Sequence, residues 1–484
     1  METLQRTANR GSISTGYDIE NSLKFESDNS ETMYKSITNG NQQKWTTSIW
    51  FKRTEVDVTS GYRQHLILHN SKTYSVRISF GTTSYTDQLY VQTTDGTSLY
   101  EKITKMKFRD TSAWYHIVWR VDTTQATATD RVRIYVNGNL ISDYESGTTE
   151  PPQNTNLIAN YNVTSGINQV WFSDYDPSGF FNGYIAEVNH VDGQSLAPTD
   201  FGEFDADTGI WKPIAYTGSY GNNGFYLDFE DSASLGADDS GNGNNFTLNN
   251  ITSADQATDT PTNSFTTFND KCFYINTQVY AEAIVRKGNT SWETTRASWW
   301  RTGISINGVS NGKWYAEFTA NTSIFMVGVG SYDKIDYTTN QGLNTHLGAA
   351  YTGAIGYYGQ NGNIYDSSTN YSWGSTFTSG DIISIALDRD NGYVYFAKNG
   401  TWQNSGDPTS GSSGTGGVSL TYPSDAYYMG VSFFDSNICL ANWGGYTDIS
   451  IASGNADAND YGNFEYAPPS GYYAWCTKNL AEFG

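Results

Sequence analysis

The chain has 484 residues and a formal net charge of −22, from 28 Lys and Arg against 50 Asp and Glu. This charge argues against nucleic acid or an anionic membrane surface as a partner, since both bind through basic patches. No apolar run approaches the roughly 18 residues needed to span a membrane, so we expect no membrane insertion.

Length and composition together predict at least two folded β domains. A single hydrophobic core seldom serves a chain of 484 residues. The 48 Gly, 36 Tyr and 14 Trp suit short strands joined by tight turns better than helices. The three cysteines, Cys272, Cys439 and Cys476, are too few and too widely spaced for a disulfide framework or a zinc site. We therefore expect small buried residues or free thiols and assembly in a reducing cytoplasm.

The first half of the chain reads as an irregular arm followed by closely spaced strands. The arm covers residues 1–21. In the run Val132–Val136, apolar side chains alternate with Arg133 and Tyr135, and this period of two is typical of a strand with one buried face. Asn137-Gly138 then supplies the positive φ angles of a two-residue hairpin turn.

Five of these runs are similar, in order, to a laminin-G-like jelly roll of the concanavalin A type: SLKFES, WTTSIWFK, WYHIVWRVD, RVRIYVNGNLI and GYIAEV. The similarity covers about residues 22–215. Its most distinctive part is a Trp-x-His step followed by the Tyr-Val-Asn-Gly strand. The resemblance implies an antiparallel β-sandwich.

Residues 216–274 are rich in turn formers, and we assign them to a linker that includes the opening strand of a second unit. The piece TSADQATDTPTNS has the composition of a linker. The piece FEDSASLGADDSGNGNNFTLNN resembles the opening strand and loop of another concanavalin-like unit. On this interpretation the domain boundary lies near residue 216.

Residues 275–450 resemble a SPRY domain in both order and spacing. The matching runs are GVSNGKWYAEF, FMVGVGS, GAIGYYGQNGNIY, GDIISIALDRDNGYVYFAKNGTW and YYMGVSFFDSNICLANWG. The resemblance implies a second bent antiparallel sandwich and leaves 451–484 as a C-terminal tail. The predicted fold class is therefore all-β, with two antiparallel concanavalin A-like jelly-roll sandwiches in series.

The stretch 383–403 predicts an antiparallel meander inside the second sandwich. Ile383, Ile385 and Leu387 alternate with other residues and share an inward face. Two Asn-Gly pairs, the second at Asn399-Gly400, then turn the chain. These pairs are scaffold turns, so function is expected in the loops that they space.

Two motifs match catalytic patterns formally. The segment 308–312 reads G-x-S-x-G, but a nucleophile elbow needs a helix after the serine, and KWYAEF reads as a strand. Glu203, Asp205 and Asp207 alternate as in the acidic strand of concanavalin-fold glucanases, which pairs a nucleophile with a general acid. Asp207 stands where that pattern has Glu, and the surroundings read as loop. A solvated acidic loop is favoured, and we expect a non-enzymatic protein.

One loop offers oxygen ligands at a spacing that resembles half of an EF-hand. Asp238, Ser240 and Asn242 precede Gly243, but the bidentate Glu expected at the twelfth position is Asn249. A calcium site is one interpretation, and a plain Asn/Gly turn is the favoured one. No other cofactor is expected.

Aromatic residues are the remaining functional signal in the second half. They crowd this region at Trp299-Trp300, Tyr337, Tyr357-Tyr358, Trp373 and Trp402. Exposed rings stack on sugar faces and anchor protein interfaces, although most aromatics of a sandwich belong to its core. The loop-side candidates for ligand binding are Tyr337, Tyr358, Trp373 and Trp402.

Two segments resemble parts of structural proteins of tailed bacteriophages: YAPPSGYYAWCTKNL and GFYLDFEDSASLGADDSGNGNNFT. The resemblance implies a virion protein assembled in the host cytoplasm, of tail-fibre or related surface-appendage type. Such a protein would contact other virion proteins and bind host cell-surface glycans or proteins. It would work as a symmetric homo-oligomer, commonly a trimer.

Three alternatives stay open. A capsid decoration or head-fibre protein would use the sandwiches as displayed or stabilising modules. A glycan depolymerase would act through Glu203 or Asp205. A cellular SPRY adaptor would bind peptides, but no RING, coiled-coil or B-box pattern accompanies the SPRY-like region.

Overall fold

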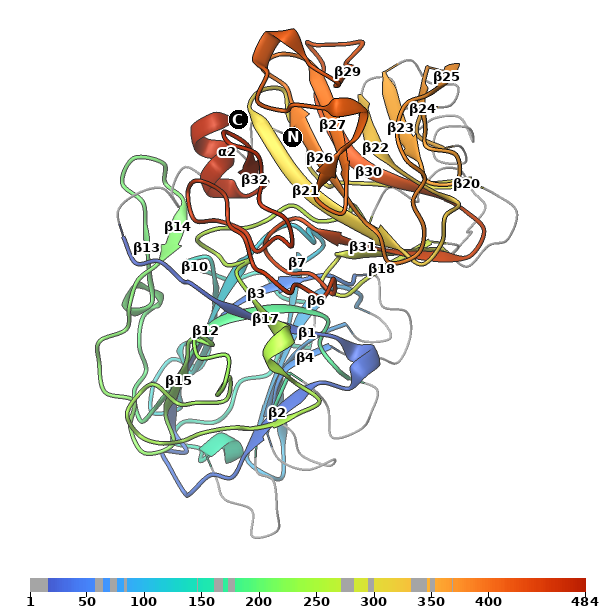
Figure 1. Ribbon diagram of the computed structural model, residues 1–484. Helices are drawn as coiled ribbons and strands as arrows, with labels where there is room; N and C mark the ends of the chain where they lie inside the picture. The colour runs from blue at the N-terminus through green and yellow to red at the C-terminus, as the bar shows by residue number, and fades with distance from the viewer. Residues whose placement is uncertain are drawn as a thin grey trace. The chain divides into compact units, whose positions relative to one another are not determined.

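The computed structural model describes residues 16–56, 64–69, 76–81, 85–145, 147–160, 169–172, 179–270, 283–294, 300–331, 346–348, 353–367 and 369–484. These residues form two compact units, one ending at Asn263 and the other starting at Ser264. We call them the N-terminal and C-terminal units. The regular secondary structure of both is mainly antiparallel sheet (Figure 1), which confirms the predicted all-β fold of two sandwiches in series. No helix in the described ranges is long and apolar enough to cross a membrane.

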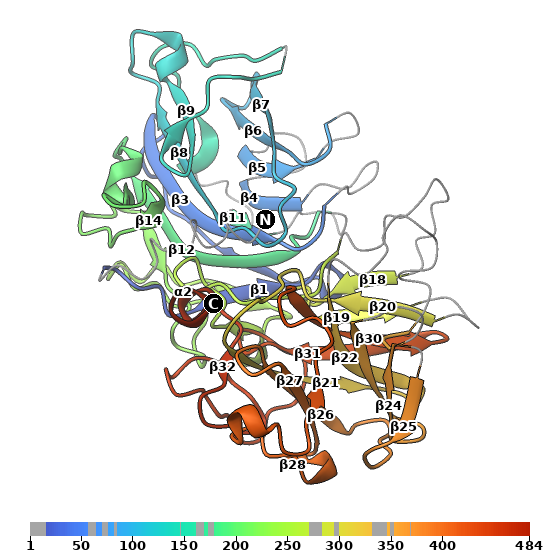
Figure 2. The same cartoon turned by 90° about the horizontal axis from the view of Figure 1, so that it is seen from above.

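The N-terminal unit is built from two main sheets. The eight-stranded sheet has the order β10 (Asn139–Leu140), β9 (Val132–Val136), β8 (Tyr115–Asp122), β3 (Lys44–Arg53), β12 (Gly183–Asp192), β1 (Ser22–Phe25) and β17 (Gln256–Ala257), with β15 (Phe225–Leu227) also paired to β12. The seven-stranded sheet has the order β16 (Thr247–Asn249), β2 (Thr32–Lys35), β11 (Gln169–Trp171), β4 (Gln64–His69), β5 (Val76–Phe80), β6 (Gln88–Thr94) and β7 (Leu99–Lys107). Figure 2 shows β9, β8, β3 and β12 side by side in that order.

Shorter elements connect these strands. A separate hairpin pairs β13 (Gly202–Phe204) with β14 (Trp211–Pro213). The 3-10 helices are η2 (Ser27–Asn29), η3 (Ala128–Asp130), η4 (Ile158–Asn160), η5 (Pro198–Asp200) and η6 (Ser253–Asp255). The predicted turn at Asn137-Gly138 joins β9 to β10 with φ values of 46° and 76°.

The core of the N-terminal unit lies between its two sheets and is dominated by large rings. Trp45 of β3 and Trp119 of β8 meet edge to face with ring centroids 5.8 Å apart. Trp171 of β11 packs edge to face against Phe225, at 5.1 Å, from the opposite sheet. Each ring buries a large apolar area, so a few of them fill the space between the sheets.

The segment 216–263, which we expected to be linker and the start of a second unit, contributes strands β15, β16 and β17 to the sheets of the N-terminal unit. The physical reason is its apolar content: Phe225 and Phe246 are buried in the core of this unit. The structure thus divides the chain after Asn263 rather than near residue 216.

The C-terminal unit is also a pair of sheets. The nine-stranded sheet has the order β18 (Ala283–Arg286), β19 (Ser291–Thr294), β31 (Asn437–Asn442), β21 (Lys313–Ala320), β26 (Ile382–Asp388), β27 (Tyr393–Lys398) and β28 (Thr401–Trp402), with β29 (Val418–Ser419) paired to β27 and β32 (Tyr473–Ala474) paired to β21. The six-stranded sheet has the order β20 (Trp300–Ile304), β30 (Tyr427–Phe434), β22 (Phe325–Ser331), β23 (Ala354–Tyr358), β24 (Asn363–Asp366) and β25 (Thr369–Ser372). The remaining elements are η8 (Gln403–Ser405), η9 (Gly411–Ser413) and α2 (Thr477–Phe483).

The predicted meander of the C-terminal unit is confirmed. Ile383, Ile385 and Leu387 of β26 are fully buried in the core between the sheets. Strand β27 runs back beside β26, and Asn399-Gly400 turns the chain into β28 with φ values of 47° and 76°.

The outer face of the nine-stranded sheet is buried as well, because the C-terminal tail covers it. Tyr315 of β21 and Tyr395 of β27 pack there against Phe464 and Tyr472 of the tail. Strand β32 extends the sheet by pairing in parallel with β21, and in Figure 1 it lies with α2 beside that strand. The tail is therefore part of the folded unit.

Candidate ligand-binding face

Tyr358 lies on the outer face of the six-stranded sheet of the C-terminal unit. Along β23, Ile355 and Tyr357 point into the core, and the strand period of two turns Tyr358 the other way. On the neighbouring β24, Ile364 is in the core, so Tyr365 also points outward. Figure 2 shows β30, β22 and β24 of this sheet.

Five aromatic side chains gather on this side of the sheet: Trp300, His346, Tyr358, Tyr365 and Phe434. We call this group the aromatic face. The ring of Trp300 lies 4.9 Å from His346, 5.8 Å from Tyr358 and 5.8 Å from Phe434. Tyr365 lies 5.2 Å from His346 and 5.8 Å from Tyr358. Tyr358 is 9% exposed and the other four are half-buried, so ring surface remains accessible.

The backbone around the aromatic face explains how His346 reaches it. A Cβ atom at Gly356 would lie 2.6 Å from the carbonyl oxygen of Leu347, so glycine lets the segment 346–348 lie close against β23. The Leu347 backbone N–H donates to the Ser432 hydroxyl at 2.9 Å. Burial lowers the pKa of His346, which keeps the ring neutral between Trp300 and Tyr365.

Amide side chains border the aromatic face. The Tyr358 hydroxyl donates to the Gln360 side chain at 2.8 Å, and the Asn361 amide lies 3.4 Å from the Tyr365 hydroxyl. Asn370 is opposite Tyr365 on the next strand and is exposed. Flat rings next to amide donors and acceptors suit a ligand with an apolar face and polar edges, such as a sugar or a polar peptide.

The other aromatic candidates do not join the aromatic face. Trp373 is half-buried against the core, with ring centroids 5.3 Å from Tyr357 and 5.8 Å from Phe396. Trp402 is half-buried against the cluster under the C-terminal tail. Tyr337 lies outside the described residues.

Sequence reasoning missed Trp300, His346, Tyr365 and Phe434 as members of one group. The alternation of side chains along each strand indicated part of this group. Phe434 and Tyr358 each follow a residue that packs in the core, so both are expected to point outward. The pairing of Trp300 with Phe434 across β20 and β30 depends on strand register, which no local pattern gives.

The acidic motif lies in the β13–β14 hairpin, with Glu203 in β13 and Asp205 and Asp207 in the turn. The Thr208 hydroxyl and backbone N–H both donate to Asp205 Oδ1, at 2.9 Å each, and they hold the pKa of Asp205 below its usual range. The Lys212 ammonium lies 3.3 Å from both Glu203 and Asp205. Asp205 thus anchors the turn, and the ammonium of Lys212 pairs with both carboxylates.

The serine of the G-x-S-x-G match precedes a strand rather than a helix. Gly312 has a φ of 78°, its backbone N–H donates to Asp390 at 2.7 Å, and β21 begins at the next residue. The strand–turn–helix that a nucleophile elbow requires is not formed around Ser310.

Asp238 uses both carboxylate oxygens to fasten its own loop. Oδ1 accepts from the backbone N–H groups of Tyr226 and Ser240 at 3.0 Å each, and Oδ2 accepts from that of Asn244 at 2.7 Å. The Asn242 amide donates to two backbone carbonyls, at 2.7 and 2.9 Å. These hydrogen bonds hold the loop together through its own backbone and side chains. Across the part of the chain that the structure describes, no group of three or more His, Cys, Asp and Glu is placed to hold a metal ion.

The two described cysteines are buried free thiols. Cys439 belongs to the core between the sheets, and Cys476 is a residue of the C-terminal tail that is buried in the cluster between the tail and the sheet. Burial raises the pKa of Cys439, so its thiol stays protonated and unreactive. Cys272 lies outside the described residues.

Comparison with known proteins bears on both units. Residues 12–198 match a family model described as the concanavalin A-like lectin/glucanases superfamily, of the laminin G type, and residues 313–417 match the SPRY domain model. No curated protein matches the chain. The chain thus carries a concanavalin A-like laminin G domain and a SPRY domain.

Similar solved structures include a human SPRY domain (15% identity, 33% of this chain and 94% of that chain covered, TM-score 0.25) and the SPRY domain of human HERC1 (19%, 33% and 91%, TM-score 0.26). The PSpry domain of TRIM65 is also similar (12%, 37% and 88%, TM-score 0.28).

Proposed function

We propose that this chain is a non-enzymatic binding protein of a tailed-phage virion, a tail fibre or related surface appendage. In this proposal the aromatic face contacts glycans or proteins of the host cell surface. The observation that carries the binding role is the gathering of five rings on one sheet face with amides at its border. Such a surface offers stacking energy and polar specificity at once.

The virion assignment is supported by the resemblance of two segments to phage structural proteins. One of them, YAPPSGYYAWCTKNL, includes β32, which pairs with β21, and Tyr472, which packs on the outer face of the nine-stranded sheet. An appendage would hold several copies of the chain in a closed homo-oligomer, commonly a trimer, anchored to other virion proteins. Repeated weak sites would then raise avidity without any single strong contact.

The candidate acidic residues support a non-enzymatic role because their carboxylates hold a turn and pair with Lys212. Incubation of the protein with host polysaccharide should leave chain length unchanged. Polysaccharide that is shortened by the wild-type protein but not by Glu203→Gln would overturn this part of the proposal and favour a depolymerase.

The binding role is tested with matched ring variants. Trp300→Ala and Tyr365→Ala should each weaken binding to host cells or to a glycan array by about tenfold, close to 1.4 kcal/mol. Tyr371→Ala is the control, since Tyr371 is an exposed ring on β25 that pairs with the inward-pointing Ile364. Unchanged binding in both face variants, or an equal loss in the control, would contradict the assignment of the aromatic face.

The place in the virion is tested by labelling intact particles with an antibody to the chain. Label on the tail or its fibres is expected, at several copies per particle. Label on the capsid would replace the tail-fibre proposal with a capsid decoration or head fibre.

A further inference from the structure

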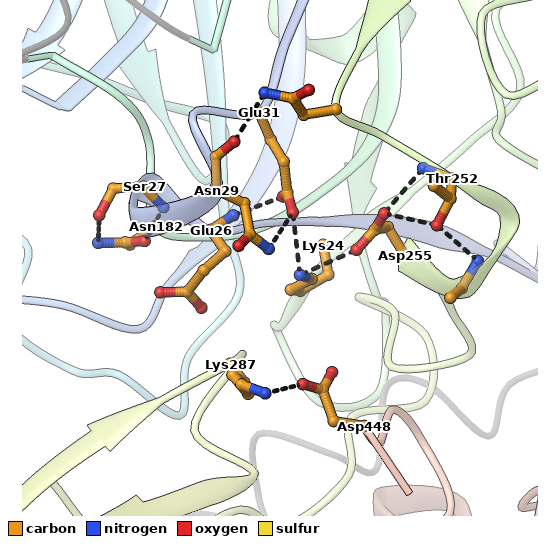
Figure 3. Close-up of polar contacts among 12 residues, drawn as sticks. Lys24, Glu26, Ser27, Asn29, Glu31, Asn182, Thr252, Asp255, Lys287 and Asp448 are labelled. Carbon is orange, nitrogen blue, oxygen red and sulfur yellow. Dashed lines mark hydrogen bonds and ion pairs between the residues drawn. The ribbon is translucent and has the colours of Figure 1, made fainter. Parts of the chain in front are cut away.

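A buried lysine joins the first and last strands of the N-terminal unit. Lys24 lies in β1, and Asp255 ends the 3-10 helix η6 directly before β17, which pairs with β1. The Lys24 ammonium is 2.9 Å from Asp255 Oδ1 and 3.4 Å from Glu31 Oε1. Figure 3 shows Lys24 between these two carboxylates. The side chains of Lys24 and Glu31 are 2% and 1% exposed, and that of Asp255 is 10% exposed.

The two oxygens of Asp255 have different surroundings. Oδ1 faces the Lys24 ammonium. Oδ2 accepts hydrogen bonds from the Thr252 backbone N–H at 2.9 Å and from its hydroxyl at 3.2 Å. Two donors on one oxygen are the arrangement that stabilises negative charge when a nucleophile adds to the carbonyl carbon.

Glu31 is held in place as a second carboxyl group beside the lysine. Its Oε2 accepts from the Glu26 backbone N–H at 2.6 Å, and its Oε1 accepts from the Asn29 amide at 2.9 Å. Burial raises the pKa of Glu31, with the Lys24 charge opposing that rise. A carboxyl with a raised pKa next to an amine can take up and return a proton.

Burial lowers the pKa of Lys24, but the charges of Glu31 and Asp255 outweigh burial and raise that pKa above its ordinary value, so the ammonium is the form before reaction. Reaction therefore starts with transfer of one proton from the Lys24 ammonium to Asp255 Oδ1, which leaves a neutral amine and a neutral carboxylic acid. The contact of 2.9 Å between Lys24 Nζ and Asp255 Oδ1 holds the nitrogen beside the carboxyl group with which it would react.

We propose that Lys24 and Asp255 form an intramolecular amide bond, with Glu31 as the proton carrier. Lys24 Nζ attacks Asp255 Cγ and forms the C–N bond, while Glu31 takes one proton from Nζ. Charge develops on Oδ2 against the Thr252 donors. Glu31 returns the proton to the Oδ1 hydroxyl, the Cγ–Oδ1 bond breaks, and one water leaves. No oxidant or other reactant is needed, and the proposal is independent of the binding function.

The bond would close the N-terminal unit covalently. Strand β1 is its first described strand, and β17 is its last. A link between them would join the two ends of the unit and keep them together even when the sheets are pulled apart.

The test is the intact mass of the purified full-length chain. The wild type should be lighter than its sequence mass by one water molecule, and a digest should contain the peptide of Lys24 joined to that of Asp255. Asp255→Asn should show no loss of water, because reaction of its amide with Lys24 would release ammonia; a water loss in this variant would overturn the proposal. Lys24→Met and Glu31→Gln should each have their full calculated mass.

Lys52→Met is the matched control. Lys52 and Asp259 form another fully buried pair, at 2.8 Å, in the same unit, but Asp259 Oδ1 accepts from the Trp114 indole. This variant should keep the loss of one water. Circular dichroism checks that each variant is folded. If Lys24→Met is unfolded, the mass of Glu31→Gln tests the proposal instead, because glutamine keeps the size and shape of the glutamate side chain. A folded wild type at its full mass, or a water loss that persists in Lys24→Met, would overturn the proposal.

Discussion

The two units differ in the partners that stabilise several of their buried charged side chains. Three buried cations of the N-terminal unit each contact an aspartate: Lys24, Lys52 and Arg53. In the C-terminal unit the buried Glu317 of β21 accepts from four neutral donors, at 2.8 to 3.2 Å. The buried Arg389 likewise donates to backbone carbonyl oxygens. These three cations thus pair with opposite charges, whereas Glu317 and Arg389 are surrounded by dipoles.

This difference determines how much folding stability is lost when one partner of a buried charge is removed. Removal of one member of a buried ion pair leaves a charge in a medium that solvates it poorly. Removal of a carboxylate held by neutral donors instead leaves unsatisfied N–H groups, each with a smaller penalty. In the C-terminal unit two of those donors, the backbone N–H groups of Glu465 and Tyr466, belong to the tail.

The largest effect is expected for Asp87→Asn in the N-terminal unit. Asp87 Oδ1 lies 3.2 Å from the Arg53 guanidinium, and both side chains are buried. The variant leaves the buried Arg53 charge without its carboxylate partner and should lower the free energy of unfolding of this unit by about 3–5 kcal/mol. Calorimetry should show the loss in the transition of the N-terminal unit and leave that of the C-terminal unit in place.

The exposed pair of Lys105 and Asp143 serves as the control for this prediction. Lys105→Ala should leave the transition unchanged, because solvent screens such a pair. An equally small effect of Asp87→Asn would show that buried pairing is not what stabilises the unit.

Glu187 is an exception in the N-terminal unit, and its pH dependence sharpens the comparison. This buried residue of β12 accepts from the hydroxyls of Tyr17 and Tyr226, at 3.0 and 2.9 Å, and burial raises its pKa to about 7. Because the folded pKa exceeds the ordinary value of 4.5, its stabilisation is present below pH 4.5 and is lost as the pH rises through 7. The expected loss is about 3 kcal/mol.

Chemical denaturation of wild type and Glu187→Gln at a series of pH values measures this contribution. The comparison is needed because His116, whose pKa burial lowers to about 3, acts in the opposite direction as the pH falls below 6.5. The difference between the two proteins should vary mainly between pH 4.5 and 7. A constant difference would mean that Glu187 titrates normally.

A smaller effect, about 2 kcal/mol, is expected for Glu317→Gln. The amide nitrogen would face donors that now point at a carboxylate oxygen, so the contacts to Glu465 and Tyr466 weaken. Limited proteolysis should then cleave within 451–484 faster than in wild type, before the sheets unfold. Unchanged cleavage would show that the aromatic cluster alone holds the tail.

The smallest effect is expected for Trp402→Ala, at about 1–2 kcal/mol. The half-buried ring packs against the cluster that contains Tyr315 and Tyr472. Thermal unfolding should show the loss, and binding to host cells should change less than in Trp300→Ala. Reduced binding at an unchanged melting temperature would restore Trp402 as a ligand-binding residue.

Sequence patterns predicted what depends on neighbours along the chain. The alternation of Ile383, Ile385 and Leu387 and the turn at Asn399-Gly400 are local properties, and both match the structure. Which strand pairs with which does not follow from such local patterns. Phe225 reads as a strand residue in any register, and only the space left in the first core decides that it is buried there.

The candidate site shows the same limit. The outward direction of Tyr358 follows from the period of its strand, but its neighbours Trp300 and Phe434 come from strands far apart in sequence. The half-burial of Trp402 depends on a cluster that includes Phe464 and Tyr472 of the tail. No pattern within a short window contains that information.

The parallel pairing of β32 with β21 also sets an order of events during synthesis. Tyr473 and Ala474 are translated after every other strand of the C-terminal unit. Until they leave the ribosome, Tyr315 and Tyr395 on the sheet have nothing to cover them from the tail. A nascent chain must therefore carry this aromatic surface without its tail cover until residues 464–474 have emerged, and chains that stop before that point would expose it to aggregation or degradation.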